Sequence, residues 1–194
     1  MLNNCKTLFF VGIGGVHMSG MAELLLSSGH TIAGSDKKSS AATERLVKKG
    51  AVVYIGHDVS HITKDIDIVV YTAAVPHDNP ELAAARAMGI TVMERAEMLG
   101  LIMKNYKYPI CISGTHGKTT TTSMLTDIFR VSEKNPTSLI GGLLPSIGGS
   151  LSIGSDNNDY FIVVTIRKNI GVVNNYKLHR LVVSPTNLGK VFDC

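Results

Sequence analysis

Two glycine-rich turns limit what this chain of 194 residues can fold into, because each lies between an apolar run and a helical pattern. The first is Gly12-Ile-Gly-Gly-Val-His17 and the second is Gly114-Thr-His-Gly-Lys-Thr-Thr120. Around them, short runs rich in β-branched residues alternate with segments of helical periodicity. This alternation predicts βαβ units built around a parallel sheet.

The periodicity also predicts where the individual elements lie. A polar and aromatic stretch at 105–108, directly before Pro109, predicts a boundary between one α/β domain at 1–105 and the start of a second at 106–161. We expect a loop or a short helix at 57–64 and a helix that begins at Asn79-Pro80, with Asn79 as its N-cap. The other expected elements are strands at 7–13, 31–33, 52–55, 68–71, 90–93 and 110–113, and helices at 18–28, 41–49, 95–103 and from the second turn to about 131.

Composition narrows the class of protein. A hydrophobic fraction of 44% with 18% charged residues excludes a disordered chain. No stretch approaches the ~18 consecutive apolar residues of a membrane span, and the apolar run at 8–11 stops at Gly12, so we expect neither a span nor a signal peptide. Cys5, Cys111 and Cys194 lack metal-like spacing, which fits a reducing compartment and a cytoplasmic location.

The net charge of +4 comes entirely from the end of the chain. Residues 162–194 hold five basic residues and one acid, whereas 1–161 hold 14 of each. A neutral body gives poor support to a nucleic-acid-binding protein. The basic residues of the tail are Arg167, Lys168, Lys177, Arg180 and Lys190.

The second turn has the context of a phosphate-binding loop, between a predicted strand and a predicted helix. Its glycines let backbone N–H groups approach phosphate oxygens, and the helix N-terminus adds partial positive charge. We expect Lys118 to reach the terminal phosphates of a nucleotide and to act in catalysis, and Thr119 to ligate Mg²⁺. Ile112 stands where the common loop pattern has glycine, so this loop is a shorter variant. The predicted phosphate-binding residues are Gly114, Thr115, His116, Gly117, Lys118, Thr119 and Thr120.

The first turn resembles a dinucleotide-binding fingerprint in which His17 replaces the third glycine. The amides of Gly14 and Gly15 could hold a pyrophosphate, and Asp36, 24 residues after Gly12, could accept a hydrogen bond from a ribose hydroxyl. A plain glycine turn with a solvated acid is the alternative.

A small, polar stretch follows the predicted strand at 68–71, and Thr72 within it could face the same ligand as the first turn. The histidines show no metal-like spacing, and we interpret each as a surface or loop residue rather than a ligand: His17, His57, His61, His77 and His116.

Several motifs in one order closely resemble the Mur ligase family, from about Leu8 to Phe161. They are Gly12-Ile-Gly-Gly-Val-His-Met-Ser-Gly-Met-Ala-Glu23, Gly34-Ser-Asp36, Asn79-Pro-Glu81, Arg95-Ala-Glu-Met-Leu99 and Ser113-Gly-Thr-His-Gly-Lys-Thr-Thr-Thr-Thr122. The resemblance implies a Rossmann-like, parallel-sheet N-terminal domain that binds a UDP-sugar, followed by the incomplete start of a P-loop ATP-binding α/β domain.

Within the family, the motifs are most similar to ligases of peptidoglycan synthesis that join L-alanine to UDP-N-acetylmuramate. The resemblance implies ATP and Mg²⁺ as cofactors, no nucleic-acid or membrane partner, and an acyl phosphate on the lactyl carboxylate. By analogy, the UDP-sugar site would comprise Gly14, Gly15, Val16, His17, Met18, Ser19, Ser35, Asp36, Thr72, Ala73, Ala74 and Val75.

The chain departs from the family pattern after Asp159-Tyr-Phe-Ile-Val163. Family members continue with a Glu-rich stretch that helps hold Mg²⁺, but here the sequence reads Val164-Thr-Ile-Arg-Lys-Asn-Ile-Gly171. We interpret 162–194 as a tail outside the family, from a shifted frame or truncated gene, with a genuinely divergent tail as the alternative. We therefore expect this chain alone to be inactive as a ligase.

Three other functions stay open at this point. A ligase that recycles murein peptides shares the second motif. An NAD-dependent oxidoreductase would use the first turn but would give the second no role. A nucleotide-binding remnant would bind the sugar nucleotide without turnover.

Overall fold

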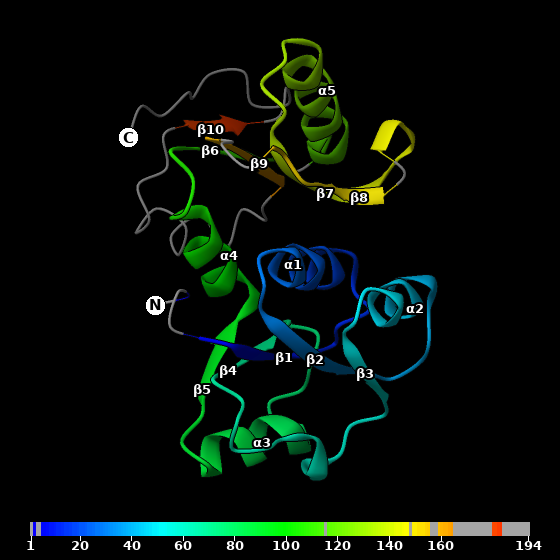
Figure 1. Cartoon of the computed structure of the whole chain (residues 1–194), viewed down its shortest axis with the longest axis vertical. Coiled ribbons are helices and arrows are strands. Elements are labelled where there is room, and N and C mark those ends of the chain that lie inside the picture. The colour runs from blue at the N-terminus through cyan, green and yellow to red at the C-terminus, as the bar shows by residue number, and fades with distance from the viewer. Residues whose placement is uncertain are drawn as a thin grey trace. The chain divides into compact units, whose positions relative to one another are not determined.

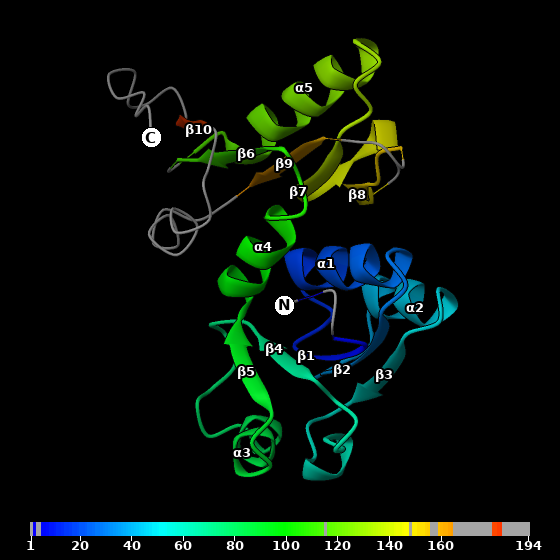
Figure 2. The same cartoon turned by 60° about the vertical axis from the view of Figure 1, so that its left-hand side comes forward.

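Two compact units make up the chain, Met1–Met98 and Leu99–Cys194, each with its own sheet (Figures 1 and 2). The computed structural model describes residues 2, 5–114, 116–147, 149–155, 159–164 and 180–183. The division falls within α4 (Arg95–Met103), a few residues before the boundary predicted at 105.

The first unit contains five parallel strands in the order β3-β2-β1-β4-β5. They are β1 (Thr7–Val11), β2 (Thr31–Asp36), β3 (Val52–Ile55), β4 (Ile68–Tyr71) and β5 (Thr91–Glu94). The chain moves outward from β1 in one direction and then returns to place β4 on the other side of β1. Ligands of open α/β sheets bind at such a switch point, outside the carboxyl ends of the strands.

Helices cover both faces of this sheet (Figures 1 and 2). On one face lie α1 (Val16–Ser27) and α2 (Ala41–Lys48), which contact each other. On the other lie α3 (Pro80–Ala87) and a short 3-10 helix, η2 (Val59–His61). Successive side chains of a strand point to opposite faces, so β1, buried on both, is a continuous apolar run. Its Phe9 and Val11 pack with Leu82 and Ala85 of α3.

The second unit contains a mixed sheet in the order β10-β6-β9-β7-β8. The strands are β6 (Tyr108–Ser113), β7 (Thr137–Leu144), β8 (Gly149–Ser152), β9 (Tyr160–Val164) and β10 (Arg180–Val183), and only the β7–β8 pair is antiparallel. Helix α5 (Lys118–Val131) follows β6 and contacts β6, β7 and β9. A 3-10 turn, η3 (Pro145–Ile147), connects β7 to β8.

Strand β9 crosses the point at which the sequence leaves the family pattern. It lies between β6 and β7, and Ile162, Val163 and Val164 are buried. The first residues of the predicted tail therefore belong to a central strand. The rest of the tail, apart from β10, lies outside the described residues.

Most predicted elements match the structure within a few residues, and the start of α3 is confirmed in detail. Asn79 Oδ1 accepts hydrogen bonds from the amides of Glu81 and Leu82, and Pro80 is the first helical residue. In the part of the chain that the structure describes, no helix has the length and apolar character needed to cross a bilayer.

Strand β2 was predicted to end at Ala33, but it continues to Asp36. The extension pairs Gly34 and Ser35 with Phe10 and Val11 of β1, and Asp36 with Ile55 of β3. A side chain at position 34 has no room, because a Cβ there would lie 2.5 Å from the Phe10 carbonyl oxygen and 2.7 Å from Ile13 Cδ1. The glycine that follows the predicted strand thus permits close packing within a longer one.

We expect Gly34→Ala to destabilise the first unit by about 3 kcal/mol, because the backbone oxygen of Phe10 cannot move away without disturbing β1. The matched control is Gly29→Ala, where φ is +89° but nothing lies within 4 Å, so only backbone strain of about 1 kcal/mol is expected. Urea unfolding monitored by circular dichroism measures both. Equal losses in the two variants would contradict this account of Gly34.

Candidate functional site: two turns at the carboxyl ends of parallel strands

The first predicted turn follows β1 and lies beside the loop that follows β4, as expected at the switch point. Gly12 has a φ of +82°, and a Cβ placed on it would lie 3.1 Å from Thr72 Cγ2 and 3.6 Å from Val75 Cγ2. The amide of Val75 donates to the Thr72 carbonyl oxygen at 2.9 Å, which closes a tight turn. Ala73 and Ala74 at its tip are exposed. Residues far apart in sequence, 12–15 and 72–75, therefore meet.

The end of β2 holds the first turn in place. The amides of Gly12 and Ile13 donate to the carbonyl oxygen of Ser35 at 2.8 and 3.0 Å. The amide of Gly14 donates to Asp36 Oδ2 at 2.8 Å. Asp36, predicted to contact a ribose, thus has one carboxylate oxygen bonded to the turn itself.

The N-terminus of α1 presents backbone donors next to this turn. Gly15 is its N-cap, with no side-chain cap hydrogen bond, and its first turn contains no acidic residue. The helix itself therefore supplies no acidic side chain to its positive end, and the nearest carboxylate is that of Asp36, bonded to the amide of Gly14. Met18 and Ser19, both predicted for the site, have buried side chains. They can contribute to a ligand site only through the backbone of the helix.

His17, in the first turn of α1, carries a buried and unsatisfied nitrogen. Its Nε2 has no hydrogen-bond partner among the described residues. Burial, and secondarily the positive charge of Arg95, lower its pKa from 6.5 to about 4. The imidazole is therefore neutral at physiological pH, which departs from the exposed histidine predicted.

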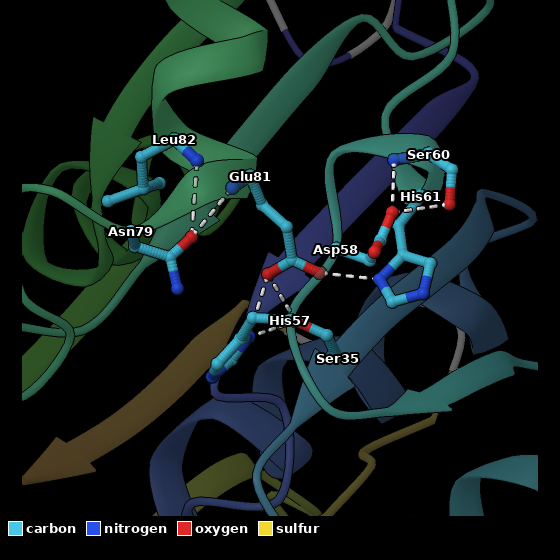
Figure 3. Close-up of polar contacts among 8 residues, drawn as sticks. All are labelled: Ser35, His57, Asp58, Ser60, His61, Asn79, Glu81 and Leu82. Atoms are coloured by element: carbon cyan, nitrogen blue, oxygen red, sulfur yellow. Dashed lines mark hydrogen bonds and ion pairs between the residues drawn. The ribbon is translucent and has the colours of Figure 1, made fainter.

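A buried acid lies behind the end of β2 (Figure 3). Glu81, in the first turn of α3, has no exposed surface. Its Oε2 accepts a hydrogen bond from Ser35 Oγ at 2.6 Å and lies 2.8 Å from His57 Nδ1, while Oε1 lies 2.7 Å from His61 Nδ1. Since a carboxylate can only accept, both imidazoles donate from Nδ1.

The two histidines of this cluster come from the connection between β3 and β4, and they are held on their other sides as well. The ring of His61 stacks on Tyr54, with centroids 4.2 Å apart. Asp58, between the histidines, caps η2 by accepting from the amide of Ser60 at 2.8 Å. His57 lies in a loop and His61 ends η2, in line with the loop histidines predicted, but the prediction did not include their bonds to a buried carboxylate.

The second predicted turn connects β6 to α5. Gly117 is the N-cap of α5, with a φ of +73°. Lys118 Nζ donates to the Gly114 carbonyl oxygen at 2.7 Å, so the lysine side chain folds back over the turn. His116 is exposed, and Thr115 lies outside the described residues.

The threonines of α5 divide into two sets. Thr119 and Thr120 are exposed on the first turn of the helix, and a Cβ placed on Gly142 of β7 would lie 3.2 Å from Thr119 Cγ2. Thr122 is buried and donates to the Lys118 carbonyl oxygen at 2.8 Å. The described residues contain no group of three or more His, Cys, Asp or Glu able to hold a metal ion. Thr119 is the predicted Mg²⁺ ligand at this turn, and its exposed hydroxyl is the kind of oxygen donor that Mg²⁺ prefers.

Comparisons with known proteins show the family to which the chain belongs. The sequence model described as Mur ligase family, catalytic domain, matches residues 7–107. The chain belongs to the Mur ligase family. It is 51% identical over 160 residues to the UDP-N-acetylmuramate–L-alanine ligase of Clostridium novyi, and 55% identical over 157 residues to that of Clostridium kluyveri. These alignments cover 82% and 81% of this chain but 34% of each relative, so the chain spans about a third of their length.

Solved structures of Mur ligases share the fold. The UDP-N-acetylmuramate–alanine ligase MurC of Thermotoga maritima superposes with a TM-score of 0.83 and 28% identity, over 93% of this chain and 41% of that one. The UDP-N-acetylmuramate:L-alanyl-gamma-D-glutamyl-meso-diaminopimelate ligase of Neisseria meningitidis superposes with a TM-score of 0.74 and 26% identity, over 82% of this chain and 52% of that one. The predicted α/β class and the Mur ligase resemblance are both confirmed.

Sequence reasoning placed Ser35 in the site of this Mur ligase but missed the Glu81 cluster around it. Glu81 stood out only as part of Asn79-Pro-Glu81, a helix-start pattern that predicts an exposed acid. A signal was present in the four-residue spacing of His57 and His61 beside a run of apolar residues. Nothing local, however, shows that these side chains turn toward α3.

The low pKa of His17 makes stability depend on pH. Between about pH 6.5 and 4 the unfolded chain binds more protons at this histidine than the folded chain does. The free energy of unfolding therefore stays constant for this group above pH 6.5 and falls as the pH drops toward 4, by about 3 kcal/mol at most. We expect His17→Asn to remove this component, so that the urea midpoint of the wild type falls relative to that of the variant as the pH drops from 6.5 to 4. Parallel pH profiles would show that His17 is not buried in its neutral form.

Proposed function

We propose that this chain is the N-terminal part of a ligase that joins L-alanine to the lactyl carboxylate of UDP-N-acetylmuramate, in the cytoplasm. The observation that carries the proposal is the 51–55% identity to ligases of that name, over more than four fifths of this chain. The solved alanine ligase of Thermotoga and the peptide ligase of Neisseria share the fold at 28% and 26% identity, so the sequence identity to the clostridial ligases, and not the fold, favours the alanine-adding reaction over peptide recycling.

The first unit supplies the binding site for the UDP end of the substrate in this proposal. The amides in the first turn of α1 face the diphosphate, because those of Gly14 and Gly15 already donate to Asp36 Oδ2 and to the Gly12 carbonyl oxygen. Residues 72–75 and the end of β2 line the site. Asp36 serves two purposes in this proposal: Oδ2 holds the Gly14 amide, and Oδ1 accepts a hydrogen bond from a ribose hydroxyl. His17, neutral at physiological pH, adds no charge to the site.

The second unit supplies the triphosphate site. The N-terminus of α5, with Gly117 as its N-cap, offers N–H donors to phosphate oxygens, and Lys118 compensates the charge of the transferring phosphoryl group. Mg²⁺ fits as an oxygen-seeking ion at Thr119, and when bound it would neutralise phosphate charge. The carboxylate of the sugar nucleotide attacks the γ-phosphorus, ADP leaves, and the amine of alanine then displaces phosphate from the acyl phosphate.

The proposed division of the chain follows the same logic. Residues 1–105 form the UDP-sugar-binding domain, 106–161 form the start of the ATP-binding domain, and 162–194 lie outside the family pattern. An NAD-dependent oxidoreductase would use only the first of the two turns.

Two variants separate the two sites. We expect Asp36→Ala to weaken UDP-N-acetylmuramate binding about tenfold or more, because the Gly14 amide loses its acceptor, while ATP binding is unchanged. We expect Lys118→Ala to weaken Mg-ATP binding by a similar factor while sugar-nucleotide binding is unchanged. Isothermal titration calorimetry measures all four affinities. Loss of both affinities in either variant would contradict two independent sites.

We expect the 194-residue chain, tested by itself, to bind UDP-N-acetylmuramate without forming product, since it spans about a third of its relatives' length. A coupled phosphate-release assay with ATP, Mg²⁺, UDP-N-acetylmuramate and L-alanine measures this. Phosphate release that requires both co-substrates would refute the expectation, and binding of NAD in place of the sugar nucleotide would refute the proposed function.

A further inference from the structure

The Glu81 cluster joins three segments that are distant in sequence. Glu81 lies on α3, Ser35 on β2, and the two histidines on the connection between β3 and β4. A carboxylate with no exposed surface is expensive to bury unless strong donors surround it. Three side-chain donors within 2.8 Å meet that requirement here.

Packing alone does not require this acid. Leu82 and Ala85 of α3 and Ile62, just after η2, already form an apolar contact with Phe9 and Val11 of β1. An apolar residue at position 81 would join that core without any need for polar partners. The cluster therefore adds directional bonds where non-directional packing already exists.

Ser35 connects the cluster to the first turn. Its hydroxyl donates to Glu81, and its backbone carbonyl oxygen accepts from the amides of Gly12 and Ile13. The next residue, Asp36, accepts from the amide of Gly14. A single fully buried residue, Ser35, therefore contacts Glu81 through its side chain and the first turn through its backbone.

We propose that Glu81 is a positioning residue of the sugar-nucleotide site: with His57 and His61 it fixes Ser35, and Ser35 fixes the Gly12–Gly14 backbone in the geometry that receives the diphosphate. Glu81 does not touch the ligand in this arrangement. The identity of the ligand rests on the function proposed above, but the effect on the turn does not.

The test combines Glu81→Gln with a carboxylate of matched role at the opposite end of the sheet. Asp67 Oδ2 accepts from the backbone amides of Lys6 and Thr7 at 2.7 and 3.0 Å, at the amino end of β1. Asp67→Asn therefore weakens backbone hydrogen bonds to a carboxylate without touching the turn. Ser35→Ala provides a second route, since it removes the bond to Glu81 but keeps the carbonyl oxygen.

Amide hydrogen exchange followed by NMR gives the readout that does not need a ligand. In Glu81→Gln and Ser35→Ala we expect the amides of Gly12 and Ile13 to exchange about tenfold faster or more, and those of β5 to be unchanged. In Asp67→Asn we expect the exchange of Gly12 and Ile13 to match that of the wild type, whatever happens to overall stability.

Calorimetry with UDP-N-acetylmuramate gives the second readout. We expect binding to weaken about tenfold or more in Glu81→Gln and Ser35→Ala, with Mg-ATP affinity unchanged in all variants. The proposal is overturned if the amides of Gly12 and Ile13 exchange at the wild-type rate in both Glu81→Gln and Ser35→Ala. It is also overturned if Asp67→Asn changes amide exchange and ligand affinity as much as Glu81→Gln and Ser35→Ala do. If the wild type binds no UDP-N-acetylmuramate but the exchange differences hold, the proposed function fails and the role of Glu81 stands.

Discussion

Hydrogen bonds between the first turn and the end of β2 are the constraint on which the rest of the first unit depends. The Ser35 carbonyl oxygen accepts from two successive amides, those of Gly12 and Ile13, and Asp36 accepts from the next, that of Gly14. With its backbone held in this way, the chain leaves β1 at a fixed angle and enters α1 with Gly15 as N-cap. The helix N-terminus, which supplies the partial positive charge of the site, is aimed by these bonds.

The two turns differ in how they would compensate the negative charge of a bound phosphate group. At the second turn a lysine lies on the loop itself, and Lys118 donates to the Gly114 carbonyl oxygen across the turn. The first turn contains no cation, and its histidine is held neutral by burial. It must therefore bind an anion through backbone amides. The stabilisation that these amides give to the anion depends on how accurately they are placed. A supporting layer behind the backbone matters more at the first turn than at the second.

Sequence periodicity was sufficient for the local parts of the structure. The start of α3 at Asn79-Pro80, the β3 and β4 bounds and the positions of both turns depend on neighbours along the chain, and these predictions are confirmed. The extension of β2 was missed because the role of Gly34 comes from the close approach of Phe10, which is not its neighbour along the chain. The residues predicted to contact ligand stay predictions, although the structure brings 12–15, 35–36 and 72–75 together.

The Glu81 cluster could not be predicted for a related physical reason. Its bonds join residues 20 to 46 positions apart, and no periodicity records which polar side chain will be buried. Energy does not explain its presence either, since a buried ionic cluster contributes little net stability compared with apolar packing of the same volume. What such a cluster does provide is direction: each bond restricts an angle as well as a distance. In a site that binds through backbone amides, that restriction is the property that packing alone would not supply.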